Sequence, residues 1–164
     1  MPPTAVLDAA ALMVLNENRC PPNGTGACIA TPHAGEMAKL TGQAKAAVAA
    51  DPERTARAAA TRFSCHVVLK GPTTVLAAPD GRAWRHASAN PGLAMSGSGD
   101  VLAGLIAGLA ARGTPPEQAA VWGVALHAAA GRAFAARLGA VGFLARELND
   151  VVPALMHGYA APPR

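Results

Sequence analysis

AMSGSGDVLAGLIAGLAARG, residues 94–113, joins a glycine-rich segment to a long apolar one. Four small residues, 96–99, lead into Asp100, and no other charged residue occurs before Arg112. Apolar residues then recur at the i, i+3, i+4, i+7 spacing of one helix face. A cation at the end of the run suits the negative end of the helix dipole. The stretch therefore predicts a glycine loop that leads into a buried helix over 101–111.

This junction has two interpretations. Glycines before a helix leave backbone N–H groups free to face an anion, and the positive end of the helix dipole adds to the attraction. Residues Ser96 to Gly99 could then hold a phosphate, although the pattern matches neither common phosphate-binding loop motif. Asp100 would face the reacting group and could accept a proton from a hydroxyl. The alternative is an ordinary helix start capped by Asp100, and spacing alone leaves both open.

Strand signals dominate the first half of the chain. Apolar or β-prone runs occur at 5–8, 28–30, 66–70, 73–77 and 83–86. The last two flank Pro79-Asp80-Gly81, the residue order of a tight turn, which predicts a hairpin or a three-strand meander. Because helical patterns separate the earlier runs and fill the C-terminal half, we expect an α/β sheet covered by helices.

Polar residues follow three of these runs. Asp8, Thr31 to His33 and Lys70 each stand where a predicted strand ends, and ligands gather at the carboxyl ends of strands in such sheets. Lys70 could hold a phosphate together with hydroxyls of the following 71–74 segment. Taken singly, each residue has a plainer interpretation: Asp8 and His33 as helix caps, Lys70 as a lysine extending to solvent. Their convergence is what predicts a site.

Composition narrows the class of protein. The length of 164 residues fits one domain, and a net charge of +4 without any run of Lys or Arg argues against a nucleic-acid arm or a membrane patch. Three cysteines, with no C-x-x-C pair, indicate neither a disulfide framework nor a zinc site. The longest apolar run is too short to span a bilayer, and no basic leader precedes it. We expect a soluble, cytoplasmic chain.

Several local predictions concern the helices. Asp51 should cap a helix that runs to about Arg62, and 114–117 matches a capping box that opens a helix reaching about Leu138. We expect a last helix over 145–156, broken at Pro153. The glycines of the 101–111 helix, Gly104 and Gly108, should form a small face that lets a neighbour approach closely. The remaining histidines, at 66, 86, 127 and 157, show no ligand spacing and are interpreted as structural.

In the segments that contain the strand-end polar residues and the glycine loop, the chain resembles the ADP/ATP-dependent NAD(P)H-hydrate dehydratases of the ribokinase-like superfamily. The similar segments are TPHAGEMAKLTG (31–42), VVLKGPTTVLAAPDG (67–81), ANPGLAMSGSGDVLAGLIAGLAARG (89–113), AAVWGVALHAAAGRAFA (119–135) and GAVGFLARELNDVVP (139–153). The resemblance implies a ribokinase-like three-layer α/β/α fold, N-terminally truncated, with a C-terminal helical part. It implies one partial domain over 1–158 and a disordered tail over 159–164.

The resemblance also implies a reaction: hydrated NADH or NADPH is dehydrated back to the intact dinucleotide at the expense of ADP or ATP, with Mg²⁺ expected on the phosphates. Asp100 would be the catalytic base, and His33 and Asp100 would contact the hydrated substrate. The adenine nucleotide would be bound by Lys70, Gly71, Pro72, Thr73, Thr74, Gly97, Ser98 and Gly99. The partners are thus two small molecules, without nucleic acid or membrane, and the chain could form a homo-oligomer.

The chain departs from the family pattern at three places. Ala34 and Ala89 replace a usual proline and glycine, and the strand-end Asp-Ala-Asp pattern reads Asp8-Ala9-Ala10. The resemblance also implies that the chain begins partway into the family domain. A sheet cut in this way exposes an edge strand, so we expect poor stability or dimerisation. Two alternatives stay open: a ribokinase-like small-molecule kinase and an inactive nucleotide-binding module.

Overall fold

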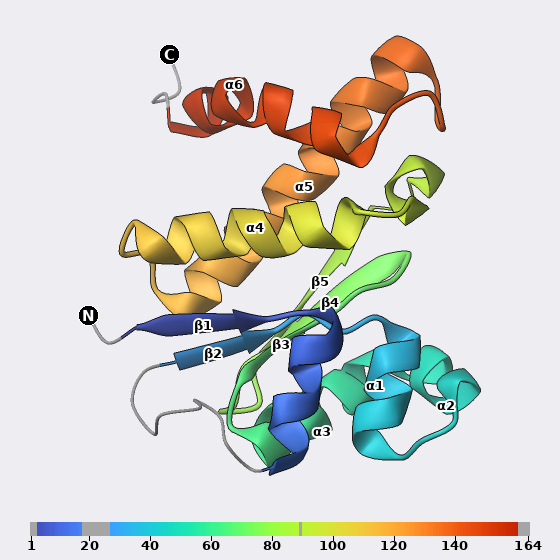
Figure 1. The fold of residues 1–164 in the computed structure, drawn as a ribbon, viewed down its shortest axis with the longest axis vertical. Coiled ribbons are helices and arrows are strands. Elements are labelled where there is room, and N and C mark those ends of the chain that lie inside the picture. Colours follow the sequence, from blue (N-terminus) through green and yellow to red (C-terminus); the bar gives the residue numbers. More distant parts are fainter. Residues whose placement is uncertain (1–2, 18–26, 89, 161–164) are drawn as a thin grey trace.

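A five-stranded sheet forms the centre of the molecule (Figure 1). The computed structural model describes residues 3–17, 27–88 and 90–160. The strands are β1 (Thr4–Leu7), β2 (Ala27–Ala30), β3 (His66–Leu69), β4 (Thr73–Ala77) and β5 (Ala83–Ala87), in that spatial order. β1, β2 and β3 are parallel, whereas β4 and β5 run antiparallel as a meander. The predicted strands and the predicted hairpin are confirmed.

Helices cover both faces of the sheet. One face carries α1 (Ala34–Thr41), α2 (Lys45–Ala50), α3 (Pro52–Phe63) and the 3-10 segment η1 (Ala9–Glu17). The other carries α4 (Ser98–Ala111), which follows the 3-10 turn η2 (Pro91–Ala94), and α5 (Pro116–Leu138). The 3-10 turn η3 (Ala145–Glu147) leads into α6 (Leu148–Ala160), which packs on α5. Successive strand residues point to opposite faces, so Val67 joins one core and Val68 the other. The three-layer α/β/α architecture with a C-terminal helical part is confirmed.

The apolar stripe of α4 lies on the sheet. Leu102 and Ile106 are buried in one cluster with Ile29 and Val68 of β2 and β3. Leu105 faces the other way and packs against the cluster that α5 and α6 share. The stripe predicted from the spacing is therefore split between two neighbours, because α4 is enclosed from both sides.

The close approach between helices occurs at a different glycine from those predicted. No atom lies within 4 Å of a Cβ built at Gly104 or Gly108, and both glycines are exposed. At Gly123 of α5, in contrast, an added Cβ would collide with Ile106 of α4. The prediction for Gly104 and Gly108 was wrong, because those residues face outward while Gly123 carries the α4–α5 contact.

Of the two helix caps predicted from the sequence, one is confirmed and one is wrong. The Asp51 cap of α3 is confirmed, since Arg54 N donates to Asp51 Oδ1 at 3.1 Å. The capping box at Thr114 is wrong, because α5 begins one residue later, with Pro115 at the N-cap and no side-chain cap. Glu117 is then out of register for the box, and its Oε2 instead lies 2.7 Å from Arg82 Nη2.

The last helix is continuous. α6 passes through Pro153 without a break, so that prediction was wrong. Pro153 removes one hydrogen bond to a carbonyl, but the residue is exposed and water can take the place of the missing partner. α6 extends to Ala160, two residues into the tail predicted from 159. Residues 161–164 lie outside the described residues, as does the sequence Asn-Gly-Thr-Gly at 23–26, which is a turn signal.

Helix α5 is long and apolar enough to cross a membrane by length and composition alone. Over half of that apolar window, 56%, is buried inside the protein. Its contacts with α4, α6 and three strands make it a core helix here.

The edge of β1 carries the first prediction. No described strand pairs with the outer side of β1, where the alternation of a parallel ladder points the Thr4 N–H away from β2. We expect concentration-dependent self-association through this edge, seen in sedimentation velocity. Thr4→Pro should shift the chain to monomer, because proline at an edge strand blocks added strands. A wild-type chain that is monomeric at every concentration and melts cooperatively would contradict this prediction.

Candidate functional site

The carboxyl ends of three parallel strands meet at one edge of the sheet. Asp8 follows β1, Thr31 and His33 follow β2, and Lys70 follows β3. His33 and Lys70 form a β-bridge just beyond the paired strands. The convergence predicted from the sequence is therefore confirmed as a spatial cluster.

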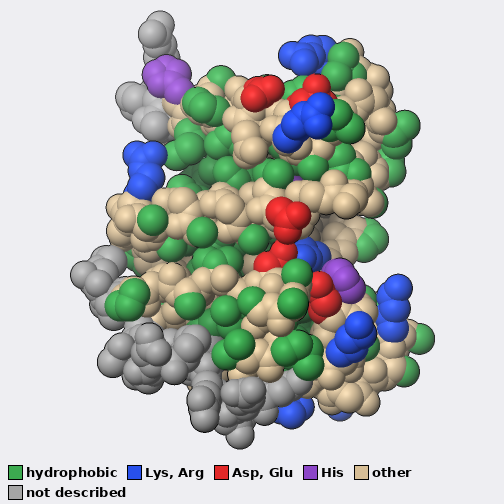
Figure 2. Space-filling view, in the orientation of Figure 1, with side chains coloured by type: hydrophobic (Ala, Val, Ile, Leu, Met, Phe, Trp, Pro, Cys, Tyr) green, Lys and Arg blue, Asp and Glu red, His purple; other side chains and the backbone are tan. Residues whose placement is uncertain are grey.

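An ion pair holds Lys70 across this edge. Lys70 Nζ donates to Asp8 Oδ1 at 2.7 Å, and the hydroxyl of Thr31 donates to the same oxygen at 2.6 Å. Burial alone would raise the pKa of Asp8, but the hydrogen bonds from Lys70 and Thr31 outweigh it and lower that pKa. Glu36 Oε2 lies 4.0 Å from the same ammonium. Figure 2 shows charged and histidine side chains gathered midway along this face of a molecule that is otherwise poor in charge.

Asp8 lies both at a strand end and at the start of η1. Its carboxylate binds a lysine that follows a strand two places away in the sheet. A hydrogen bond with the backbone of Ala9, the first residue of η1, also lowers the pKa of Asp8, so the helix-cap interpretation holds beside the ion pair. In the sequence, the signal for the ion pair was the position of Asp8 at the end of a strand. Only the order of the strands in the sheet shows which cation Asp8 faces.

The first turn of α4 reaches the same place. Gly97 is the N-cap residue of α4, and Ser98 and Gly99 begin the helix. A Cβ built on Gly99 would lie 3.1 Å from Lys70 Nζ and 3.7 Å from Asp8 Oδ2. The ammonium thus lies almost against the positive end of the helix dipole, an arrangement suited to an anion.

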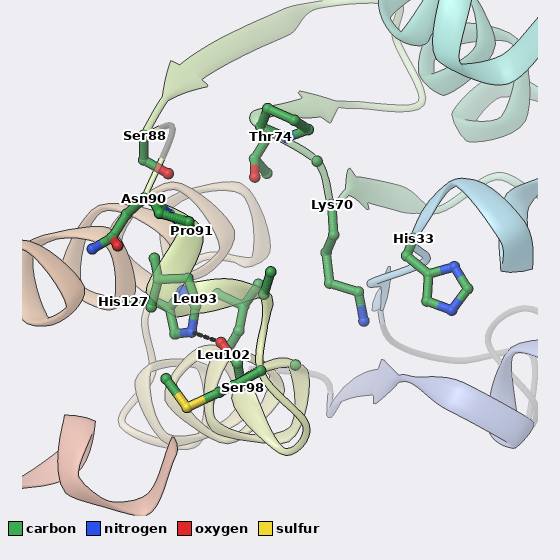
Figure 3. A pocket seen from close by; sticks show the side chains of 15 residues that line it. His33, Lys70, Thr74, Ser88, Asn90, Pro91, Leu93, Ser98, Leu102 and His127 are labelled. Carbon is green, nitrogen blue, oxygen red and sulfur yellow. Dashed lines mark hydrogen bonds between the residues drawn. The ribbon is translucent and has the colours of Figure 1, made fainter. Parts of the chain in front are cut away.

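A cavity of about 640 Å³ opens between these elements (Figure 3). Its lining is mostly apolar with a few polar groups: His33, Lys70, Gly71, Pro72, Thr74, Ser88, Asn90, Pro91, Leu93, Ala94, Met95, Ser98, Gly99, Leu102 and His127. Seven of the predicted site residues are in this set. Thr73, Gly97 and Asp100 are outside it, although Asp100 stands next to the lining residue Gly99 in the exposed first turn of α4.

His33 caps a helix and also lines the cavity. Its Nδ1 accepts hydrogen bonds from Gly35 N at 3.0 Å and Glu36 N at 3.1 Å, and Glu36 Oε2 accepts from His33 N at 2.8 Å. This reciprocal cap fixes the start of α1. The ring remains exposed and lines the cavity, opposite Ser98 and His127 (Figure 3).

Two polar residues of the cavity were missed as site residues. His127 of α5 was interpreted as structural, but its Nε2 lies 3.0 Å from Ser98 Oγ. Burial is the main cause that lowers the pKa of His127 to about 4. Asn90 accepts from Gly92 N through Oδ1, while its buried Nδ2 has no partner among the described residues. Neither residue could be found from local spacing, because α5 and the segment after β5 meet only in the folded chain.

The described residues include no group of three or more His, Cys, Asp or Glu side chains that could hold a metal ion. Magnesium is usually held by one or two carboxylates together with substrate phosphates and water. No side chain among the described residues is therefore assigned to magnesium.

Fold and site together define a class: a ribokinase-like α/β protein in which a helix begins beside a strand-end lysine. The sequence model of the family described as NAD(P)H-hydrate dehydratase matches residues 1–154. The chain belongs to this family.

Individual relatives agree with this assignment. The chain is 53% identical over 128 residues to an ADP-dependent (S)-NAD(P)H-hydrate dehydratase of Xanthomonas campestris, which covers 78% of this chain and 44% of that protein. It is 42% identical to a bifunctional NAD(P)H-hydrate repair enzyme of Moorella thermoacetica, covering 91% of this chain and 28% of that protein.

Among solved structures, an ADP/ATP-dependent NAD(P)H-hydrate dehydratase from Bacillus subtilis, co-crystallised with ATP/Mg²⁺, superposes with a TM-score of 0.86 at 33% identity. The match covers 95% of this chain and 55% of that one. A ribokinase-like superfamily protein from Enterococcus faecalis gives a TM-score of 0.75 at 25% identity, over 96% of this chain and 53% of that one. The chain thus spans about half the length of these dehydratase relatives.

Burial of His127 predicts a pH dependence of stability. A histidine whose pKa falls from 6.5 unfolded to about 4 folded must stay neutral in the native state. The part of the free energy of unfolding that depends on neutral His127 is therefore fully present above pH 6.5. It is lost as the pH falls toward 4, and the total loss is about 3 kcal/mol. We expect His127→Gln to remove this part of the pH dependence. The measurement is the free energy of unfolding, from urea titrations at several pH values between 4 and 6.5. Equal slopes for wild type and variant would contradict it, and exposed His157 serves as the control position.

Gly99 in the first turn of α4 and the Lys70 ammonium beside it are called the anion cradle below. A side chain added at Gly99 is predicted to weaken anion binding without lowering the free energy of unfolding. Gly99→Ala should displace the flexible end of Lys70 from Asp8 and weaken binding of pyrophosphate, measured by calorimetry. The matched control is Gly104→Ala on the same helix, where the Cβ meets nothing. The control should raise the free energy of unfolding by about 0.5–1 kcal/mol and leave binding unchanged. Equal pyrophosphate affinity in both variants would contradict the cradle.

Proposed function

We propose that this chain takes part in ADP-dependent or ATP-dependent dehydration of hydrated NADH or NADPH, a lyase reaction that repairs damaged nicotinamide nucleotides in the cytoplasm. The observation that carries the proposal is the meeting of Lys70, held by Asp8, with the open first turn of α4 at the mouth of one cavity. The names of the relatives, and the co-crystallisation of one of them with ATP/Mg²⁺, support it.

The nucleotide phosphates would bind where positive charge is concentrated. Lys70 would act as a point charge, and the backbone N–H group of Gly99 in the first turn of α4 would face a phosphate oxygen. Gly71 to Thr74, Gly97 and Ser98 would complete the nucleotide site. Magnesium would arrive on the phosphates and reduce their charge during transfer.

The apolar side of the cavity suits a flat ring. Leu93, Met95 and Leu102 line this side of the cavity, beside the anion cradle. Ligand sites commonly combine such an apolar wall with a few polar groups that fix orientation. We assign this wall to the base of the adenine nucleotide and the side near His33 to the hydrated nicotinamide.

Asp100 would be the catalytic base. Its carboxylate would accept the proton of the ring hydroxyl as that oxygen takes a phosphoryl group from the nucleotide. The phosphate would then leave with the C–O bonding pair, and loss of a proton from the adjoining ring carbon would restore the double bond. Phosphorylation is useful because hydroxide is a poor leaving group. Lys70 and the helix start would stabilise the charge that develops on the phosphate.

The decisive experiment supplies hydrated NADH with ADP or ATP and follows the return of NADH absorbance, with AMP and phosphate measured in parallel. Return of absorbance supports the proposal. Phosphoryl transfer to an added alcohol without that return would favour a small-molecule kinase. Nucleotide binding without any turnover would favour an inactive nucleotide-binding module. No binding of either nucleotide would overturn the proposal.

Asp100→Asn provides a test of the assigned base. We expect turnover to fall by about 100-fold or more while ADP affinity changes little, because the substitution removes a proton acceptor and keeps the shape. Asp150→Asn is the matched control, since Asp150 is likewise exposed in the first turn of a helix, α6. Full turnover in the Asp100 variant would refute its role as base.

A further inference from the structure

A buried polar pair joins α4 to α5 in the wall of the cavity. Ser98 Oγ lies 3.0 Å from His127 Nε2, and the two residues are only 3% and 9% exposed (Figure 3). The function proposed above gives the Ser98 hydroxyl no defined direction and gives His127 no part. A titratable group buried beside the anion cradle therefore lacks a role.

The direction of this hydrogen bond decides what Ser98 offers to the cavity. A neutral imidazole has one donor and one acceptor nitrogen, and a hydroxyl has one donor proton. If the hydroxyl donates to Nε2, only its lone pairs face the cavity and they would repel an anion. If Nε2–H donates to Oγ, the hydroxyl proton stays available to a ligand.

A phosphate in the cavity would favour the second arrangement. Lys70 and the N-terminal turn of α4 line the same cavity, and both attract anions. A hydroxyl proton directed at the phosphate would add to this attraction, whereas lone pairs of the serine oxygen would weaken it.

We propose that His127 is a positioning residue: it donates its Nε2–H to Ser98 Oγ and so directs the Ser98 hydroxyl proton toward a phosphate group at the first turn of α4. The phosphate in this inference rests on the proposed function. Because the imidazole is neutral, it orients the hydroxyl without adding charge to the cradle. The chemical class that it helps to select is a phosphate ester or anhydride.

The tautomer can be measured without any ligand. Long-range ¹H–¹⁵N correlation spectra of the labelled chain distinguish Nε2–H from Nδ1–H imidazoles, and His127→Gln identifies the resonance. The Nε2–H form supports the proposal. An Nδ1–H form would overturn it, whatever the chain binds.

Binding separates a phosphate-directing role from simple packing. The probes are ADP and adenosine, which share a base and differ in phosphate. We expect His127→Leu and Ser98→Ala each to weaken ADP binding about fivefold, the size of one net hydrogen bond, and to leave adenosine binding unchanged. His127→Gln, which keeps a donor near the position of Nε2, should bind ADP as wild type does. The control is His157→Gln on exposed α6.

Each possible result either supports the inference or overturns it. A His127→Leu protein that loses ADP and adenosine affinity equally, or loses neither, would overturn the inference. Failure of the glutamine variant to rescue would do the same. If the leucine variant does not fold, Ser98→Ala and the tautomer decide. A wild-type chain that binds adenosine but neither ADP nor pyrophosphate would overturn the proposed function, whereas selective binding of ADP with no response to the variants would overturn this inference alone.

Discussion

The position of the Lys70 ammonium is the constraint on which the rest of the site depends. It lies against the first turn of α4, where the helix dipole is positive, so two positive groups point at one place. The Asp8 carboxylate, 2.7 Å away and fixed by Thr31, offsets that repulsion. An anion in the cavity would interact favourably with both positive groups.

The fold supplies this geometry through three parallel strands and two helices. Parallel pairing of β1, β2 and β3 brings their carboxyl ends to one edge, and a side chain after each strand meets the others there. Gly123 lets α5 approach α4 closely enough for His127 to reach Ser98. The same packing that builds the core therefore also builds the polar wall of the cavity.

Much of the architecture was predictable because its signals are local. Turn residues at 79–81, alternating apolar runs and the Asp51 cap act within a few residues of each other, and the structure confirms each of them. The wrong predictions have a common cause. Thr114, Gly104 and Pro153 were interpreted from local rules, whereas the start of α5, the facing of α4 and the continuity of α6 depend on neighbouring elements.

The sequence by itself determined the class of fold and the family, because motif order and strand-end chemistry are written along the chain. It also determined that Asp8, His33 and Lys70 should converge, since parallel strands bring equivalent ends together. Only the tertiary structure decided that Asp8 binds Lys70, that Gly99 leaves room for the ammonium, and that His127 faces Ser98. Those contacts join residues 29 to 62 positions apart, and no local pattern fixes such pairs before the helices have packed on the sheet.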